Sequence, residues 1–454
     1  YNALGQEHPL TAASLHNLAL VYFAEGKARE AEVVWSQAAQ SFDAVRLRYG
    51  VSGLERARER ALADGSPWSA LAICLARQGK AAEAFRSLEA GLARGLRDEL
   101  ASRSPPGTPG AGEAYEIDRI QRLLRPHQAL VAWIGLAPRA HRGALPAEAW
   151  AFVVRSKGPP TAVRLETDEG ESDSLLRELR SPPRDGGAGD APGLAGKVKS
   201  RWFAPLEPHL QGREGLPAAR EMIVIASGSS LRVPLGVLSQ EHAASYTPSA
   251  TVHAWLAERR SSRREHPSRK AFAVEGIDEP ALQSLASSGQ LREYSFIHFP
   301  SSADLGGRRA LGCSVRLGPV SSAGPHSSDG KLTAAEVLKS WRLDAEVVAL
   351  SSSDAGLGTP GEGDGFLGFA QAFLAAGSQG VLVSLWPVGA GPTRLLMGRF
   401  RENMLQRNLP GPQALHEAQR WLRELSPRDT TSQEARPYGH PHYWAGFLWI
   451  GEGG

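Results

Sequence analysis

Val347-Val348-Ala349-Leu350-Ser351-Ser352-Ser353-Asp354-Ala355-Gly356 is the stretch that decides the fold. Its first four residues are an apolar run, which is typical of a strand buried on both faces. The run passes directly into small polar residues, and Phe296-Ile297-His298-Phe299-Pro300-Ser301-Ser302-Ala303 has the same design. Open α/β sheets place their functional sites just outside the carboxyl ends of their strands. We therefore expect the two polar segments to form one site.

Apolar runs of this kind alternate with helical patterns along most of the chain after residue 113. Continuous apolar strands separated by helices predict a mostly parallel sheet that is flanked by helices, so the expected fold class is α/β. The expected strands are 129–134, 149–155, 161–165, 221–226, 270–274, 294–299, 346–351 and 380–385, and the expected helices are 115–124, 172–179, 194–206, 333–341, 367–376 and 393–405.

Two copies of a helical hairpin pattern precede this part. The first is Leu15-x2-Leu18-Ala19-x2-Tyr22 followed by Gly26, Ala31 and Trp35, and the second is Trp68-x2-Leu71-Ala72-x2-Leu75 followed by Gly79, Ala84 and Leu88. The internal spacings agree and are those of tetratricopeptide repeats. We expect residues 1–101 to form such an α-helical segment, acting as a structural cap more than as a complete peptide groove, with further repeats upstream of Tyr1. The Pro- and Gly-rich residues 102–113 are expected to be a linker.

The composition is that of an ordinary globular protein. The 454 residues are 42% hydrophobic and 22% charged, with a net charge of +3. This near-neutral balance makes nucleic acid an unlikely partner, and the basic run 259–270, which has no interleaved aromatic residues, is expected to be a solvated connector. No apolar run approaches the length of a membrane helix, and the N-terminus has no signal-type stretch. The expected location is therefore cytoplasmic.

Few residues suit a metal or a cofactor. Cys74 and Cys313 lie far apart, which excludes a zinc site of the usual spacing and a disulfide framework. His440 and His442 have no carboxylate or cysteine nearby in the sequence, so they are not expected to bind metal. The glycine-rich residues 356–365 lack the Gly-Lys-Ser/Thr ending of a phosphate-binding loop. We therefore expect neither a cofactor nor a metal.

Several motifs give the α/β part a family resemblance. Arg220–Leu238 resembles a strand-loop-"PL..L" segment, and residues 361–377 resemble a glycine-rich turn with its following helix. Val381–Val388 is close to an "SLWPV" strand, and His440–Phe447 to an "HP.YWA.F" strand. With these motifs, residues from about 113 to 454 resemble the CHAT domain, a caspase- and separase-related peptidase domain usually found behind tetratricopeptide repeats. The resemblance implies a caspase-like fold with an N-terminal, pseudo-caspase half at 114–245 and a C-terminal half at 246–454 that carries the site.

The resemblance also implies a catalytic dyad, and both of its positions are altered here. The family's histidine, in an "ATHG"-like loop, aligns with Ser302, and its cysteine, in an "LSACETG"-like loop, aligns with Ser353. A cysteine nucleophile works because histidine lowers the pKa of its thiol, whereas a serine hydroxyl depends on a positioned base. Ser302 cannot act as that base. The substitutions therefore favour a catalytically inactive pseudo-protease.

The alternative is an active hydrolase that uses Ser353 as nucleophile with a non-standard base. The candidate bases are His298, His326 and His442. His298 is four residues upstream of Ser302, roughly 13 Å along an extended strand. We therefore expect His298 to be a satisfied strand-end residue, and the alternative would need a histidine within hydrogen-bond reach of Ser353.

The expected partner is a protein or a peptide, bound by the caspase-like cleft, by the repeat segment or by both. An extended segment can add to a sheet while pockets read its alternate side chains. Candidate cleft residues are Ser301, Asp304, Asp354 and Asp364, although loop carboxylates serve equally well as caps or as solvated groups. The resemblance implies a regulator, inhibitor or scaffold in a bacterial proteolytic or defence pathway. The sequence indicates neither the identity of the partner nor the oligomeric state.

Overall fold

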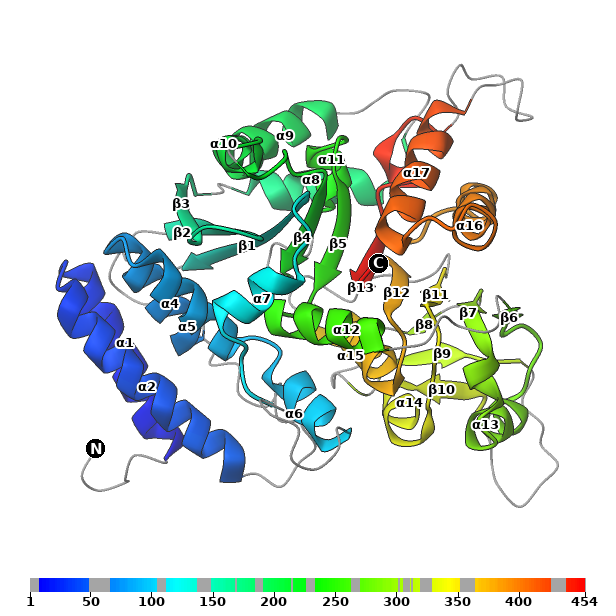
Figure 1. Ribbon diagram of the computed structural model, residues 1–454, viewed down its shortest axis with the longest axis horizontal. Helices are drawn as coiled ribbons and strands as arrows, with labels where there is room; N and C mark the ends of the chain where they lie inside the picture. Colours follow the sequence, from blue (N-terminus) through cyan, green and yellow to red (C-terminus); the bar gives the residue numbers. More distant parts are fainter. Residues whose placement is uncertain are drawn as a thin grey trace.

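A computed structural model shows the arrangement of the chain (Figure 1). The structure describes residues 8–48, 66–103, 112–136, 148–167, 170–183, 191–213, 215–225, 233–262, 270–300, 303–304, 311, 313–318, 329–351, 364–425 and 438–453.

The N-terminal segment consists of helical hairpins, as the repeat pattern predicts. In the order of the chain, its helices are α1 (Pro9–Ala24), α2 (Ala28–Arg48), α4 (Pro67–Arg77) and α5 (Ala81–Gly91). The turns of the two hairpins are equivalent, because Gly26 has φ 75° and Gly79 has φ 77°, a left-handed conformation that glycine adopts without strain. The amide after each glycine donates to a carbonyl five residues earlier, from Lys27 to Tyr22 at 2.9 Å in the first hairpin. The sequence repeat is thus a repeat of structure.

Buried alanines allow the helices of each hairpin to approach closely. Ala19, Ala31, Ala72 and Ala84 are fully buried at the four positions that the spacing predicts for small residues. The larger flanking residues differ between the hairpins. Leu71 is 6% exposed, whereas its counterpart Leu18 is 43% exposed, so only the second hairpin is covered on this face.

In the described part of the chain after these helices, ten strands form one sheet in the order β3-β2-β1-β4-β5-β13-β12-β11-β7-β6. Six of its nine strand pairs are parallel, and the exceptions are β3–β2, β2–β1 and β13–β12. The strands are β1 (Gln128–Leu136), β2 (Glu148–Arg155), β3 (Thr161–Leu165), β4 (Glu221–Ile225), β5 (Ala243–Thr247), β6 (Lys270–Ala273), β7 (Tyr294–Phe299), β11 (Val347–Leu350), β12 (Gly380–Ser384) and β13 (Phe447–Gly451).

The sheet has two halves whose parallel strands run in opposite directions. Strands β1, β4, β5 and β13 share one direction, and β12, β11, β7 and β6 share the other. The two sets meet where β13, which follows all the other strands in the sequence, lies between β5 and β12 (Figure 1). The expected boundary after residue 245 falls inside β5, so the division into halves at that residue remains a proposal.

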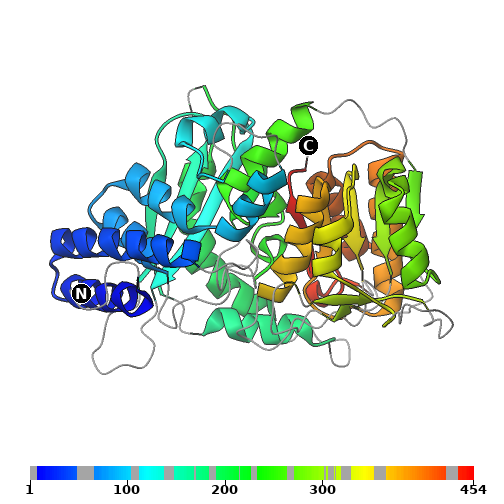
Figure 2. The ribbon, with the colours of Figure 1, turned by 90° about the horizontal axis from the view of Figure 1, so that it is seen from below.

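Helices cover the sheet, and a small second sheet, β10-β9-β8, lies beside its second half. Figure 2 shows the helical segment at one end of the molecule and the second half of the sheet at the other. The remaining elements are α6 (Arg94–Arg103), α7 (Ile117–Leu123), α8 (Glu171–Arg180), α9 (Ala191–Val198), η1 (Lys199–Phe203), η2 (Ala204–Leu206), α10 (Glu207–Leu210), α11 (Leu235–Leu238), α12 (Ala250–Ser262), α13 (Glu279–Ser287), η4 (Gln290–Glu293), β8 (Ala303–Asp304), β9 (Ser314–Arg316), β10 (Lys331–Thr333), α14 (Ala334–Ser340), α15 (Asp364–Ala376), α16 (Ala390–Leu405), α17 (Gly411–Glu424) and η7 (Pro441–Tyr443).

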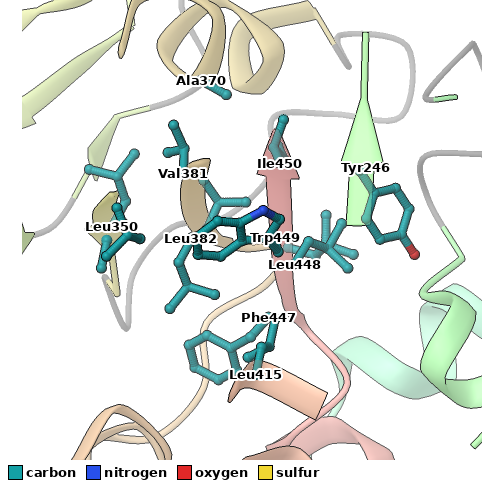
Figure 3. Close-up of a cluster of buried hydrophobic side chains, with 14 of the residues drawn as sticks. Tyr246, Leu350, Ala370, Val381, Leu382, Leu415, Phe447, Leu448, Trp449 and Ile450 are labelled. Carbon is teal, nitrogen blue, oxygen red and sulfur yellow. The ribbon is translucent and has the colours of Figure 1, made fainter. Parts of the chain in front are cut away.

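Trp449 is at the centre of the core where the two halves join. It lies on β13 and is 1% exposed, among side chains from β5, β12 and α17 (Figure 3). Gly380 and Gly411 make room for its indole, because a β-carbon at either glycine would lie 2.0 and 2.2 Å, respectively, from the ring. Close packing of this kind leaves little tolerance for added volume.

A buried carboxylate connects the repeat segment to the sheet domain. Glu89 on α5 is 1% exposed and accepts hydrogen bonds from the backbone amides of Ala250 and Thr251, at 2.8 and 2.9 Å, and from the Thr251 hydroxyl at 2.9 Å. These amides are at the start of α12, where a helix leaves its first donors unpaired and favours negative charge. Glu89 therefore caps a helix of the other segment.

The expectation that the basic run 259–270 is a solvated connector is wrong for its first two residues. The Arg259 guanidinium donates to the carbonyls of Leu374 at 3.1 Å and Gly377 at 3.2 Å, and also to that of Ser378. Arg260 forms an ion pair with the buried Glu452 at 3.2 Å. Arginine has five donors in a rigid fork, which allows it to satisfy the carbonyls at the end of α15. Residues 263–269 lie outside the described residues.

None of the described helices is both long and apolar enough to cross a membrane.

Candidate functional site

The two strands that were expected to carry the site are neighbours. Strands β7 and β11 are parallel, with His298 opposite Ala349 and Phe299 opposite Leu350. The backbone amide of Ser351 continues this pairing by donating to the Phe299 carbonyl at 3.3 Å. Both polar segments therefore begin side by side at the carboxyl ends of their strands, as predicted from the two apolar runs.

Most of the residues predicted for the site lie outside the described residues. They are Ser301, Ser302, Ser353 and Asp354, together with the candidate base His326. The backbone of Asp304 belongs to β8, where it pairs with Ser314 of β9, and Asp364 is the first residue of α15. The side chains of these two aspartates lie outside the described part, so their role in a peptide cleft remains a prediction.

The structure instead shows a contact that the sequence analysis missed. His298 Nε2 lies 2.5 Å from Ser351 Oγ, and Ser351 is only 5% exposed. The strand register explains the contact. Ala349 is opposite His298, and Ser351 lies two residues further along, on the same face of the sheet. The pair therefore links the carboxyl-terminal ends of β7 and β11, where the two polar segments begin.

Burial keeps the imidazole of this pair neutral. Burial and, to a lesser extent, the positive charge of Arg401 together lower the pKa of His298 to about 4. At neutral pH the ring is thus uncharged, and its Nε2 can accept the Ser351 hydroxyl proton in a hydrogen bond. His298 is therefore a hydrogen-bonded strand-end residue, as the sequence analysis expected.

The surroundings of the pair do not favour proton transfer. In a serine hydrolase, a carboxylate orients the histidine and stabilises the imidazolium that forms. Within the described part of the chain, the charged group that acts on His298 is Arg401, which has the opposite effect, and the Phe296 ring lies edge-on at 6.5 Å. The pair is consequently better suited to holding two strand ends together than to activating a nucleophile.

The other histidine candidate that the structure describes is engaged elsewhere. His442 is buried, and its Nδ1 lies 3.0 Å from the carbonyl of Leu179. His440 accepts a hydrogen bond at its own Nδ1 from the His442 amide at 3.2 Å, which is a local cap of η7. In the described ranges, no three His, Cys, Asp or Glu side chains are grouped as a metal site would require.

Comparison with a family model identifies the part of the chain that contains these strands. Residues 239–452 match the model of the CHAT domain. This part of the chain is a CHAT domain. The match begins just before β5 and includes β7, β11, β12 and β13, so both polar segments of the candidate site belong to the CHAT domain.

Two sequence relatives are named for tetratricopeptide repeats. The chain is 37% identical over 120 residues to "Tetratricopeptide repeat protein 28" of Mus musculus and, to the same extent, to that of Homo sapiens. The match covers 26% of this chain and 4% of each relative, so the chain spans a small fraction of the length of these proteins. Both relatives are mammalian, and the bacterial setting expected for the CHAT domain remains a prediction.

Solved structures share the overall fold of almost the whole chain. Separase of Saccharomyces cerevisiae, in its complex with securin, superimposes with a TM-score of 0.54 at 9% identity, covering 94% of this chain and 37% of separase. A second structure of the complex gives a TM-score of 0.50. At this identity the likeness shows the fold alone. That fold is a helical segment followed by a mostly parallel α/β sheet, part of which belongs to the CHAT domain.

Proposed function

We propose that this chain is a catalytically inactive, CHAT-type pseudo-protease that binds a protein or peptide partner as a regulator, inhibitor or scaffold. The observation that carries the proposal is the pair of serines, Ser302 and Ser353, at the two positions that align with the family's dyad. The contact between His298 and Ser351 supports it, because this imidazole is already engaged with a different hydroxyl.

The chemistry of the substituted residues supports the same conclusion. A serine hydroxyl at position 353 needs a base, and a second hydroxyl at position 302 cannot supply one at neutral pH. His298, a neighbouring imidazole, is neutral but partly buried beside Arg401, whose charge would oppose formation of an imidazolium. Without a base and without a thiol, the site retains what the fold provides, which is a surface at the carboxyl ends of two strands.

A binding role is consistent with the comparisons. Yeast separase, whose fold this chain shares, was crystallised in complex with securin, so this architecture is able to engage a protein partner. The mammalian relatives are named for tetratricopeptide repeats, and repeat arrays of this kind form extended binding surfaces. We also propose that the chain acts in a bacterial proteolytic or defence pathway, and this part of the proposal rests only on the family resemblance.

A fluorophosphonate probe tests the loss of catalysis. The probe reacts with activated serines, so we expect no labelling of the full chain, alone or in a lysate, and no difference from Ser353→Ala. Labelling that is lost in Ser353→Ala would refute the proposal and establish the alternative, a hydrolase that uses Ser353 with a non-standard base.

Restoring the dyad provides a second test. We expect the double variant Ser302→His, Ser353→Cys to react with a peptidyl acyloxymethyl ketone at least tenfold faster than the single variant Ser353→Cys, because a neighbouring imidazole promotes formation of the thiolate. Equal rates would show that the two segments do not bring these positions together, and the assignment of the degenerate dyad would then be wrong.

A further inference from the structure

A cavity of about 700 Å³ lies away from the ends of β7 and β11, near the junction between the two halves of the sheet. One wall comes from α9, η1 and α10, and the other from α17 and the residues before β13. The residues that follow α11 complete it, and Figure 1 shows α9, α10 and α11 gathered beside β4 and β5. Its volume is in the range of pockets that bind small molecules or a few residues of a peptide.

The floor of the cavity is apolar and aromatic. Phe203, Leu210 and Trp444 line it and are 1%, 3% and 4% exposed, respectively. Ser239 and His242 also line it, and their side chains are joined by a 2.6 Å contact between Oγ and Nδ1. This combination of apolar floor and fixed polar groups is typical of a site that binds a bulky apolar group in a defined orientation.

An exposed glycine of a helix lines the cavity. Gly196 belongs to α9 and lines the cavity, and a β-carbon at this position would meet no atom within 4 Å. Glycine destabilises a helix relative to alanine. No neighbouring atom would clash with a larger residue at Gly196, so close packing does not explain the glycine. A larger side chain can therefore be introduced at Gly196, on the wall of the cavity, without displacing atoms of the protein.

The charges around the cavity are balanced. Two ion pairs lie here: Lys199 Nζ is 3.8 Å from Glu207 Oε1, and Arg423 Nη2 is 3.1 Å from Glu424 Oε1. Glu241 also lines the cavity, so an anionic ligand would face carboxylates on its rim. The polar side chains that remain are neutral donors and acceptors, including Gln211 and Gln240. A neutral ligand with both donors and acceptors matches this rim better than a phosphate or a fatty acid does.

We infer that this cavity binds a neutral peptide segment of the protein partner, with a bulky aliphatic or aromatic side chain seated against Phe203 and Trp444. The inference rests on the proposed function, in that it assigns the partner's anchor to this cavity and not to the strand ends at Ser302 and Ser353. The backbone amides of the segment would pair with the amide and hydroxyl groups of the rim, which are their natural counterparts.

The probe for this inference is N-acetyl-phenylalaninamide, titrated into the full chain and followed by saturation-transfer NMR. We expect a dissociation constant of roughly 1 mM, as is usual for a ligand of this size. In Gly196→Trp the indole should occupy the cavity and weaken binding at least tenfold. The control is Gly398→Trp, since Gly398 is also a helical glycine with no atom within 4 Å of its β-carbon position, and it lies on α16, outside the lining of the cavity.

Several outcomes would overturn the inference: unchanged binding in Gly196→Trp, equal loss in Gly398→Trp, no binding of the probe, or tighter binding of octanoate. If Gly196→Trp fails to fold, hydrogen–deuterium exchange of the unaltered protein decides. Protection by the probe at 191–211 and 237–242 supports the inference, and protection elsewhere refutes it. This test does not involve Ser353, so its failure is distinguishable from labelling of Ser353, which would refute the pseudo-protease.

Discussion

Lowering the pH from 7.5 to 5 should destabilise the fold through His298. The pKa of this imidazole is about 4 in the folded protein, against an ordinary value of 6.5. The unfolded chain therefore binds a proton at His298 as the pH falls through 6.5, whereas the folded protein does not bind it until pH 4. The stability that depends on the neutral ring is complete above pH 6.5 and is lost progressively between pH 6.5 and 4.

The size of the effect follows from the same two values. One pKa unit corresponds to about 1.4 kcal/mol, so the loss is about 3 kcal/mol at its limit below pH 4 and about 2 kcal/mol at pH 5. Guanidinium unfolding at both pH values, followed by tryptophan fluorescence, measures it. The comparison variant is His298→Gln, because burial also lowers the pKa of His242, His253, His416 and His442, and their contributions cancel in the difference.

An equal loss of stability in the original protein and in His298→Gln would refute this reasoning. NMR titration of histidine labelled with carbon-13 gives a direct check, since the ring signal of His298 should not move until well below pH 6. Ser351→Ala separates the causes. Burial and Arg401 account for the shift, so the pKa of His298 should stay near 4 in that variant. A return toward 6.5 would assign the shift to the hydrogen bond.

Three further predictions concern stability, each measured by guanidinium unfolding. Glu89→Ala should cost about 3 kcal/mol, because it leaves three buried donors at the start of α12 without their acceptor, and a loss below about 1 kcal/mol would exclude the capping role. Leu71→Ala should cost about 2–4 kcal/mol and Leu18→Ala less than about 1 kcal/mol, since only the first is buried, and equal costs would contradict the comparison of the hairpins. Gly411→Ala should cost about 1–3 kcal/mol by contact with the central indole, while Gly398→Ala should be neutral or stabilising, and the reverse order would refute the packing argument.

Local sequence patterns predicted the strands whose residues are almost all apolar because both faces are buried. The apolar runs at 221–226, 294–299 and 346–351 became β4, β7 and β11, because a strand covered on both faces must be apolar throughout. The strand β5 (Ala-Ala-Ser-Tyr-Thr) was not expected. Its short sequence is partly polar, and its place in the sheet depends on pairing with β4 and β13.

Long-range geometry limited what could be predicted of the site. The sequence predicts that each of the two polar segments follows a buried strand, because an apolar run and the small polar residues after it are local patterns. The contact between His298 and Ser351 depends on the register between strands more than 50 residues apart, and no local pattern reports that register. The error at Arg259 has a similar cause, since the carbonyls that it satisfies belong to a helix end more than 100 residues away.

The position of β13 at the junction of the two halves has a consequence for how the protein is made. Because β13 follows every other described strand in the sequence, a ribosome synthesises β5 and β12 before the strand that separates them. Until β13 emerges, a nascent chain that has folded both halves presents two open strand edges, which are templates for wrong pairing. Translation that stops before residue 447 would therefore yield two unjoined half-sheets, and we expect such products to depend on chaperones or to aggregate.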